Sequence, residues 1–309
     1  MASPHIIVVG SSNTDMVVQA DRLPLPGETV LGGDLVIAPG GKGANQAVAA
    51  ARLGAHVTFV ARVGQDMFGQ EALSNFQREG LDTRYVVQDP DAPSGVALIV
   101  VDSDGQNIIA VAPGANRRLS PADVEAASPA FSEARSVLLQ LEIPLETVMA
   151  AAKAGRSAGA TVILNPAPAP SSPLPDELFT YVDILTPNET EATALTGHET
   201  PEDAALVLLR KGVDAVIVTL GEEGALVATG PDQMRRVLGF RVEAVDATAA
   251  GDAFNGALAV ALARGDSLDA AVRYAHAVAA LSVTRLGAQP SLPTAEEVDA
   301  FLKEARSLS

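Results

Sequence analysis

Short runs of β-branched and aliphatic residues alternate with longer stretches rich in Ala and Leu along most of the chain. The short runs predict strands, whereas the longer stretches, in which apolar residues recur at helical spacing, predict helices. In the stretch that begins at Phe68, for example, the next apolar residues are Ala72, Leu73 and Phe76. Such alternation predicts an α/β fold with a mostly parallel sheet sandwiched by helices. Sheets of this kind bind their ligands at the carboxyl ends of the strands.

The expected boundaries follow from the same pattern. Strands are expected at residues 6–9, 57–61, 137–141, 161–164, 182–186 and 215–219. Helices are expected at residues 44–53, 68–79, 145–158, 189–195, 203–211, 251–263, 267–284 and 295–305. The chain shows no internal repeat and no low-complexity linker, so we expect residues 1–309 to form a single domain at the upper edge of single-core size.

Two apolar stretches, at residues 29–38 and 95–113, depart from the alternation because no helix follows them. Both are expected to be extended, and the pair Asp104-Gly105 in the second predicts a hairpin turn. We interpret them as a small projecting β-sheet, with its strands within about 12–38 and 95–113. Such a sheet would serve as a lid that excludes water from a reaction, or as a contact between two copies of the chain.

Composition excludes several classes of function. The chain has no cysteine, which excludes disulfides, thiolate catalysis and cysteine-ligated metals. A formal net charge of −17, from 21 basic and 38 acidic residues, disfavours nucleic acid and membrane surfaces as partners. An anionic ligand must then be held by backbone amides, helix N-termini or a bound cation. Without a long apolar run or a recognisable secretory signal, we expect a cytoplasmic protein.

The string Asp-Ala-Thr-Ala-Ala-Gly-Asp-Ala-Phe-Asn-Gly at residues 246–256 is the most informative in the chain. It follows an expected extended run at residues 240–245 and opens an apolar helix. Its small residues Ala249, Ala250 and Gly251 leave backbone N–H groups open, at a helix N-terminus that carries about half a positive charge. This arrangement suits the negative charge of a phosphoryl group during transfer.

Asp252 stands in the first turn of that helix. An isolated aspartate there would be interpreted as a helix cap. Transfer of a phosphoryl group to a hydroxyl, however, needs a base that accepts the proton, and an aspartate beside anion-binding amides is suited to this role. Because Asp246 precedes it by six residues, with the Ala-Ala-Gly turn between them, the full string favours a catalytic base.

The string resembles the C-terminal signature of the ribokinase-like carbohydrate kinases, the family that includes fructokinases and adenosine kinase. The resemblance runs from Ile6 to Phe301, and further similar strings occur in the family's order. It implies the family's α/β fold and the ATP-dependent phosphorylation of a small sugar, with D-ribose and its O5 as the best match. It also implies that Asp252 is the base, and that the anion hole is formed by Ala249, Ala250 and Gly251. Threonines frequent in the family are replaced here by Ala247 and Ala253, and the former lies beside an expected cation site.

A glycine-rich string at residues 40–50 precedes an expected helix. It is not a Walker phosphate loop, because Gly43, and not Ser or Thr, follows Lys42. From the residues alone, a ligand-binding loop and a tight turn before a packed helix are equally open. The resemblance implies that Gly41, Lys42 and Asn45 hydrogen-bond sugar hydroxyls.

Asn13 and Asp15 follow the first expected strand, and Glu142 follows another. An amide and a carboxylate so close together suit adjacent sugar hydroxyls, but they also suit an Asx turn. The resemblance implies that all three residues bind the substrate, as does Asp252 in addition to its role as the base.

Asn188 and Glu191, three residues apart at an expected helix start, predict a capping box when considered alone. The resemblance implies that this pair places Mg²⁺, largely through water, together with the ATP phosphates. Taken alone, residues 219–224 predict a hairpin turn, and His276 predicts a satisfied core histidine. The resemblance instead implies an ATP site that comprises Asn188, Thr219, Gly221, Gly224, Gly251 and His276.

The resemblance implies a further site for an activating K⁺ ion, held largely by backbone carbonyls. Its expected residues are Asp246, Thr248, Ser282, Arg285, Gly287 and Ser291. ATP, Mg²⁺ and K⁺ are therefore the expected cofactors, and a homodimer through the lid is the expected assembly.

Alternative functions remain open at this stage. The first is a kinase for deoxyribose, another furanose or a nucleoside. The second is an NAD-dependent oxidoreductase, although the glycines of a dinucleotide fingerprint are missing after Gly10. The third is a non-catalytic sugar-binding protein, against which the presence of Asp252 and its turn argues.

Overall fold

The computed structural model describes residues 3–307, so both ends of the expected domain 1–309 lie outside the described residues. Within them, nine strands form a sheet in the order β13-β12-β11-β10-β9-β8-β1-β4-β5. Its strands are β1 His5–Val9, β4 His56–Gly64, β5 Asp82–Asp89, β8 Ser136–Leu139, β9 Thr161–Leu164, β10 Ile184–Leu185, β11 Ala215–Thr219, β12 Ala225–Gly230 and β13 Gln233–Val237. The pairs from β11 to β5 are parallel and the two beyond β11 are antiparallel, which confirms the predicted mostly parallel sheet.

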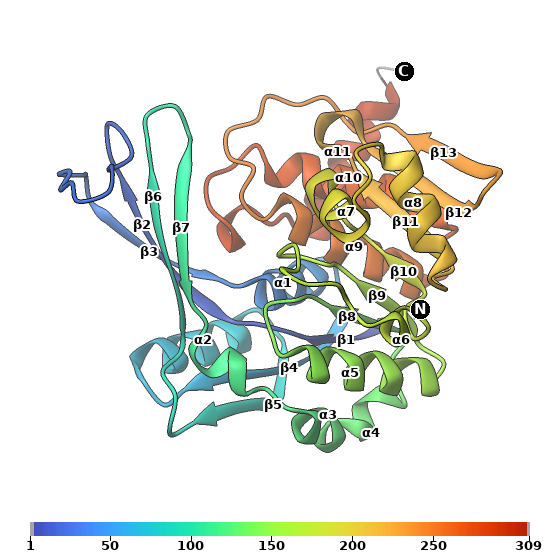
Figure 1. The fold of residues 1–309 in the computed structure, drawn as a ribbon, viewed down its shortest axis with the longest axis horizontal. Coiled ribbons are helices and arrows are strands. Elements are labelled where there is room, and N and C mark those ends of the chain that lie inside the picture. Colours follow the sequence, from blue (N-terminus) through green and yellow to red (C-terminus); the bar gives the residue numbers. More distant parts are fainter. Residues whose placement is uncertain (1–2, 308–309) are drawn as a thin grey trace.

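Helices cover both faces of this sheet (Figure 1). Side chains alternate along a strand, so Ile6 and Val8 of β1 pack into one apolar cluster and Ile7 and Val9 into the other. The first cluster contains residues of α1 Lys42–Arg52, α2 Met67–Arg78, α9 Ala250–Arg264, α10 Leu268–Ser282 and α11 Ala295–Ser307. The second contains residues of α3 Pro121–Ala126, α4 Ser128–Phe131, α5 Leu145–Ser157, α6 Asp176–Phe179, α7 Glu189–Thr196 and α8 Pro201–Arg210.

Some elements differ from the sequence prediction. Strands β5, β12 and β13 were not predicted; β5 and β13, the two edge strands, carry charged residues that weaken the apolar signal of a strand. Strand β10 is only two residues long, and Pro187 soon after it offers no N–H to continue the ladder. Residues 240–245, expected as an extended run, lie outside any strand.

The predicted small sheet, called the lid sheet below, is confirmed and projects from the main body (Figure 1). Its order is β3-β2-β6-β7, with bounds β2 Asn13–Gln19, β3 Leu35–Gly40, β6 Gly95–Val101 and β7 Asn107–Ala112. The expected hairpin joins β6 to β7, and Gly105 in its turn has a φ of 80°. Residues 29–34, expected to be extended, lie outside the strands.

One close helix contact determines where the candidate catalytic residues meet. A Cβ on Gly256 of α9 would lie 2.7 Å from Ala49 Cβ and 2.8 Å from Gln46 O of α1, so only glycine allows this approach. Asp252 precedes Gly256 by one helical turn, as Asn45 precedes Ala49. The two helices therefore begin side by side, and their N-termini point to the same end of the molecule.

Candidate active site

The N-terminus of α9 forms an open backbone turn. Its capping residue Ala249 has left-handed angles (φ 61°, ψ 13°), and no other non-glycine residue among 3–307 has a positive φ. Such a conformation costs an L-residue about 1–2 kcal/mol, so the surroundings must hold it. A left-handed residue next to right-handed ones turns successive N–H groups into an anion-binding concavity. A Cβ on Gly251 would meet no heavy atom within 4 Å, so the space beside the turn is open.

Asp252 is 6% exposed and is held by two consecutive residues of α1. Asn45 Nδ2 donates to its Oδ2 at 2.9 Å, and Gln46 Nε2 donates to its Oδ1 at 3.0 Å. Burial raises the pKa of Asp252, while the charge of Lys42 and both amide hydrogen bonds oppose that rise. The side chain is therefore oriented by polar partners at the meeting point of two helix N-termini.

The residues proposed to bind the sugar lie where the lid sheet joins the main body. Asn13 begins β2, and Gly40, the last residue of β3, pairs with it. A Cβ on Gly41 would lie 2.6 Å from Asn13 N, and Gly41 has a φ of 91°, so this approach requires glycine. Asp15, Gly41 and Lys42 are thereby brought to one end of the lid sheet.

Glu142, just beyond β8, ties these segments together. Its Oε2 accepts hydrogen bonds from Lys42 N at 3.0 Å and from Ser11 Oγ at 2.5 Å. Asn13 Oδ1 accepts a hydrogen bond from Asn116 Nδ2 at 2.8 Å.

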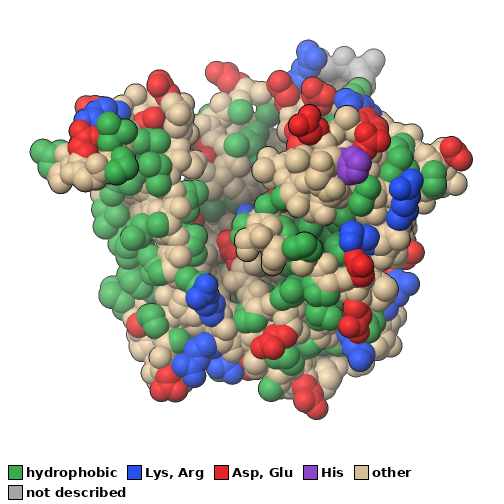
Figure 2. All heavy atoms as spheres, in the orientation of Figure 1, with side chains coloured by type: hydrophobic (Ala, Val, Ile, Leu, Met, Phe, Trp, Pro, Cys, Tyr) green, Lys and Arg blue, Asp and Glu red, His purple; other side chains and the backbone are tan. Residues whose placement is uncertain are grey.

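A cavity of about 590 Å³ lies beside these residues. Its lining includes Asn13 and Val111 from the lid sheet and Glu142 from the main body. Figure 2 shows the hollow between the lid sheet and the main body on the face in view.

Like charges shift the ionisation of these groups. Burial and the charges of Glu142 and Asp252 raise the pKa of Asp15 to about 6. Burial alone would lower the pKa of Lys42, but the surrounding carboxylates, Asp252 and Glu142 foremost, outweigh it and raise that pKa. The ammonium of Lys42 therefore stays charged among carboxylates, where it offsets their mutual repulsion.

Asn188 and Glu191 form the predicted capping box at the start of α7, which is confirmed. Asn188 N donates to Glu191 Oε2 at 2.9 Å, and Glu191 N donates to Asn188 Oδ1 at 2.8 Å. Burial raises the pKa of Glu191, which is 7% exposed. Thr219, at the end of β11, pairs with Asn188 in an isolated parallel bridge. The capping box thus satisfies the backbone N–H groups of Asn188 and Glu191 at the start of α7.

Residues 219–224 form the predicted hairpin turn between β11 and β12, with positive φ at Gly221 and Gly224.

The ring of His276 in α10 lies 5.1 Å from the ring of Phe254 in α9, measured between ring centroids. It is 6% exposed, and burial lowers its pKa to about 4. The expectation of a satisfied core histidine is corrected, because Nε2 has no hydrogen-bond partner among the described residues.

Three residues of the expected K⁺ site meet beside the α9 turn. Asp246 Oδ1 accepts hydrogen bonds from Thr248 N at 2.9 Å and Thr248 Oγ1 at 2.6 Å, and Asp246 Oδ2 accepts one from Gly287 N at 2.8 Å. These bonds lower the pKa of Asp246 against the effect of its burial. They join the loop at residues 285–291 to the approach to α9.

The side chains of the other three expected K⁺ residues have partners elsewhere. Arg285 pairs with Glu297, and the hydroxyls of Ser282 and Ser291 donate to backbone carbonyls three residues earlier. Within residues 3–307, no cluster of three or more His, Asp or Glu side chains could hold a metal ion.

The structure also reveals polar residues that the sequence reasoning missed. Gln46 contacts Asp252 directly, Ser11 contacts Glu142, and Asn116 contacts Asn13. Gln289 reaches Asn45 from the loop at residues 285–291. The position of Gln46 directly after Asn45 in the glycine-rich string could have indicated that it belongs to the site. The sequence gives no such indication for Ser11, Asn116 or Gln289, whose partners are distant in the chain.

A family model for the pfkB family carbohydrate kinases matches residues 3–295. The chain belongs to this family. Among its curated relatives, ribokinase of Haemophilus influenzae is 44% identical over 305 residues, covering 97% of this chain and 99% of the relative. Deoxyribokinase of Salmonella typhimurium is 40% identical over 305 residues, covering 96% and 98%.

Solved structures of pfkB-type kinases agree with this assignment. Ribokinase of Thermotoga maritima has a TM-score of 0.89 and 42% identity, covering 98% of this chain and all of that one. Arabidopsis thaliana ribokinase, solved with ribose and ATP, has a TM-score of 0.88 and 37% identity, covering 98% and 99%. The chain is thus a carbohydrate kinase and not an NAD-dependent oxidoreductase. No helix among the described residues is long and apolar enough to cross a membrane.

Proposed function

We propose that this protein transfers the terminal phosphoryl group of ATP to O5 of D-ribose, which yields ribose 5-phosphate and ADP. The observation that carries the proposal is the placement of Asp252, held by Asn45 and Gln46 in the first turn behind the left-handed residue Ala249. A base and a set of anion-binding amides thereby adjoin each other. The high identity to ribokinases over nearly the full length supports ribose as the acceptor.

Asp252 acts as the general base of the reaction. The O5 hydroxyl gives its proton to the carboxylate as O5 forms a bond to phosphorus, and the bond from phosphorus to ADP breaks with its electrons. The N–H groups of Ala249, Ala250 and Gly251 donate to the oxygens of the transferred group and stabilise their negative charge. Because these amides are held in place before the reaction, little reorganisation opposes it.

The sugar is held by Asn13, Asp15, Gly41, Lys42, Asn45 and Glu142. The carboxylate of Asp15 accepts hydrogen bonds from sugar hydroxyls. The side-chain amides of Asn13 and Asn45 donate to a hydroxyl through Nδ2 or accept from one through Oδ1. Such matched pairs fix the orientation of a sugar, because an unpaired buried hydroxyl is costly. This orientation places O5 next to Asp252.

The nucleotide lies along Asn188, Thr219, Gly221, Gly224 and Gly251, with His276 behind the adenine. The oxygen donors of Asn188 and Glu191 fit a Mg²⁺ ion that keeps most of its waters. A Mg²⁺ ion bound there would neutralise part of the charge of the phosphates. The shared contacts of Asp246, Thr248 and Gly287 fit a K⁺ ion that binds backbone oxygens next to the anion-hole turn, with Ser282, Arg285 and Ser291 contributing carbonyls.

We further propose that residues 1–309 act as one domain whose lid sheet covers the sugar and joins two copies of the chain. Leu35, Ile37, Leu98 and Ile108 lie on the lid face opposite to Asp15 by strand register, and each is about half exposed. Figure 2 shows apolar side chains gathered over this part of the molecule. Contiguous exposed apolar surface of this kind marks a protein contact.

Because ATP is the phosphate donor, we place the enzyme in the cytoplasm.

An ATP-consumption assay across D-ribose, 2-deoxyribose, fructose and nucleosides tests the proposed acceptor. We expect the highest kcat/KM with ribose. The relative named deoxyribokinase supports one alternative, a kinase for deoxyribose. A kcat/KM for deoxyribose equal to or above that for ribose would replace the first proposal with this one, and absence of turnover with every sugar would overturn both.

A further inference from the structure

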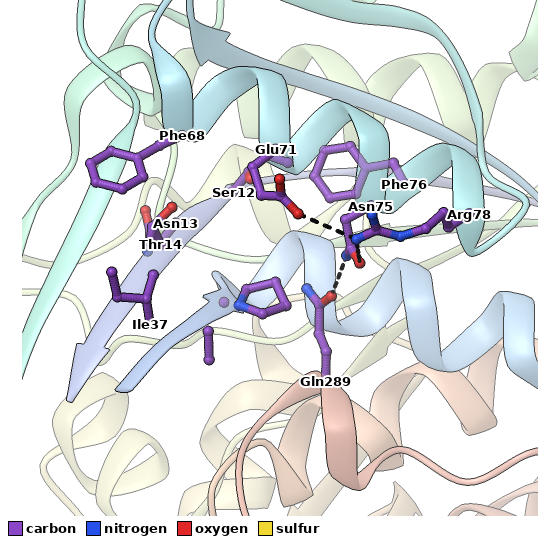
Figure 3. A pocket seen from close by; sticks show the side chains of 14 residues that line it. Ser12, Asn13, Thr14, Ile37, Phe68, Glu71, Asn75, Phe76, Arg78 and Gln289 are labelled. Atoms are coloured by element: carbon purple, nitrogen blue, oxygen red, sulfur yellow. Dashed lines mark hydrogen bonds and ion pairs between the residues drawn. The ribbon is translucent and has the colours of Figure 1, made fainter. Parts of the chain in front are cut away.

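A line of side-chain amides connects the surface of α2 to the candidate base. Asn75 Nδ2 donates to Gln289 Oε1 at 2.8 Å, and Gln289 Nε2 donates to Asn45 Oδ1 at 3.2 Å. Asn45 Nδ2 then donates to Asp252 Oδ2 at 2.9 Å. Figure 3 shows the outer end, where Asn75 of α2 points toward Gln289 across a pocket beneath the lid sheet. Hydrogen bonds therefore run without interruption from this pocket to the carboxylate.

The direction of the line is fixed at both ends. At the inner end, ionised Asp252 only accepts hydrogen bonds, so Asn45 must present its Nδ2 and keep Oδ1 for Gln289. At the outer end, Arg78 donates to Asn75 Oδ1 at 3.3 Å, and a guanidinium only donates. Every amide between them consequently donates toward Asp252. Hydrogen bonds aligned in this way polarise one another, which strengthens the final bond to the carboxylate.

Gln289 holds the central position of the line and is 2% exposed. Its backbone O accepts a hydrogen bond from Arg52 NH1 at 2.8 Å, so the side chain starts from a fixed point. The residue begins η3 Gln289–Ser291, two positions after Gly287, whose backbone N donates to Asp246. The loop at residues 285–291 thus reaches the start of α9 on one side and Asn45 on the other.

We propose that Gln289 is a positioning residue for the base: by fixing the amide of Asn45, it makes that amide donate to Asp252 and keeps the carboxylate ionised and oriented. The inference rests on the proposed function of Asp252. In the line of hydrogen bonds, Asn45 stands between Gln289 and Asp252. Gln289 therefore contacts neither the carboxylate of the base nor the proposed sugar position directly. A purely structural tie between α1, α2 and the loop would stabilise the fold but would not depend on the direction of the amides.

Gln289→Glu tests the direction with almost no change of shape. A carboxylate at position 289 only accepts, so Asn45 must turn its Nδ2 toward it and present Oδ1 to Asp252. The final hydrogen bond is then lost and replaced by repulsion, although Gln46 still holds the other oxygen. We expect the pKa of Asp252 to rise by about one unit, the effect of one hydrogen bond to a charged group.

Carboxyl ¹³C NMR of the ligand-free protein measures that pKa, with the Asp252 signal assigned from its loss in Asp252→Asn. This readout needs no sugar, so it remains valid even if ribose proves not to be the substrate. Asn75→Asp provides an independent variant at a half-buried position. It places an acceptor at the outer end, turns Gln289 and then Asn45, and is expected to raise the same pKa.

Gln77→Glu on the exposed side of α2 is the matched control, because it adds the same charge to the same region without entering the line. In ribose assays, we expect Gln289→Glu to lower kcat more strongly as pH decreases, with a loss that approaches about tenfold at low pH, because a one-unit rise in the pKa of the base lowers its ionised fraction by at most that factor. Gln77→Glu should match the wild type. An unchanged Asp252 pKa in folded Gln289→Glu or, if that variant does not fold, in Asn75→Asp overturns the proposal.

Discussion

Asn45 and Asp252 are 207 positions apart in the chain, yet the amide of the first donates to the carboxylate of the second at 2.9 Å. Gly256 makes this contact possible, because it lets α9 approach α1 more closely than any other residue would allow. The candidate base is consequently positioned by a helix crossing, and changes at that crossing are expected to affect both stability and turnover.

Replacing the base tests its role most directly. We expect Asp252→Asn to lower kcat by about 10²- to 10⁴-fold, which is the usual contribution of a general base. Ribose affinity should hardly change, because the amide keeps a similar shape and the other sugar contacts remain. Steady-state kinetics and calorimetric ribose binding measure the two effects. Asp299→Asn, an exposed change of the same charge, is the control; near-normal turnover in Asp252→Asn would remove this residue from the mechanism.

The helix crossing gives a prediction about stability. Gly256→Ala places a Cβ within 2.8 Å of α1 atoms, and overpacking of this kind typically costs about 1–3 kcal/mol. Gly251→Ala is the matched control for folding, since its Cβ would meet no heavy atom within 4 Å. Thermal unfolding should show a lower Tm for the first variant alone. Equal Tm values would show that the crossing tolerates an added methyl group.

Ribose binding should depend on pH through Asp15. Its pKa of about 6 means that the side chain is charged above that pH and uncharged below it. A charged carboxylate accepts hydrogen bonds from hydroxyls more strongly, so ribose affinity should fall as pH decreases through 6. Calorimetry between pH 5 and 8 checks this, and Asp15→Asn should abolish the pH-dependent step. A wild-type affinity that stays constant over this range would contradict the assignment.

Asp15 should also reduce the stability of the fold. Because its folded pKa lies above the ordinary value of 3.8, ionisation favours the unfolded chain, and stability falls as pH rises from 3.8 to about 6. We therefore expect Asp15→Asn to raise Tm at pH 8 but not at pH 4. Differential scanning calorimetry at the two pH values measures the difference. A lower Tm at pH 8 would show that the ionised side chain stabilises the protein instead.

The proposed K⁺ site predicts a dependence on monovalent cations. Replacing K⁺ by a large organic cation should lower the rate, because such an ion does not fit among backbone oxygens. Asp246→Asn should weaken the response to K⁺, since Asp246 holds both Thr248 and Gly287. Activity that is indifferent to the cation would show that the loop at residues 285–291 has no ion-binding role.

The proposed dimer can be tested on the lid sheet. Leu98 is 55% exposed and lies on the face opposite to Asp15, so Leu98→Asp adds charge to the proposed contact without touching the sugar residues. Light scattering should show a dimer for the wild type and a monomer for this variant. A charge added at the exposed Leu238, which follows the edge strand β13 on the side of the molecule away from the lid sheet (Figure 1), should leave the dimer intact. A wild-type monomer would contradict the contact.

The sequence alone determined the class of fold and the most informative motif. Alternation of strand and helix patterns is local information, and it was sufficient for the mostly parallel sheet, for the helices on both faces and for the lid sheet. The string at residues 246–256 likewise identified Asp252 and its turn, because small residues before an aspartate at a helix start are visible without any partner. Charged edge strands such as β5 were not predicted, because the apolar pattern of a strand is weak where its side chains face solvent.

Only the tertiary structure decided which residues act on that aspartate. Gln46 and Gln289 look like ordinary polar residues in the sequence, and their hydrogen bonds to Asp252 and Asn45 join segments that are distant in the chain. The left-handed angles of Ala249 are equally invisible, because an alanine adopts them only when the surrounding structure imposes them. Local patterns specify which elements form, whereas the close packing of distant elements sets which side chains donate hydrogen bonds to the candidate base.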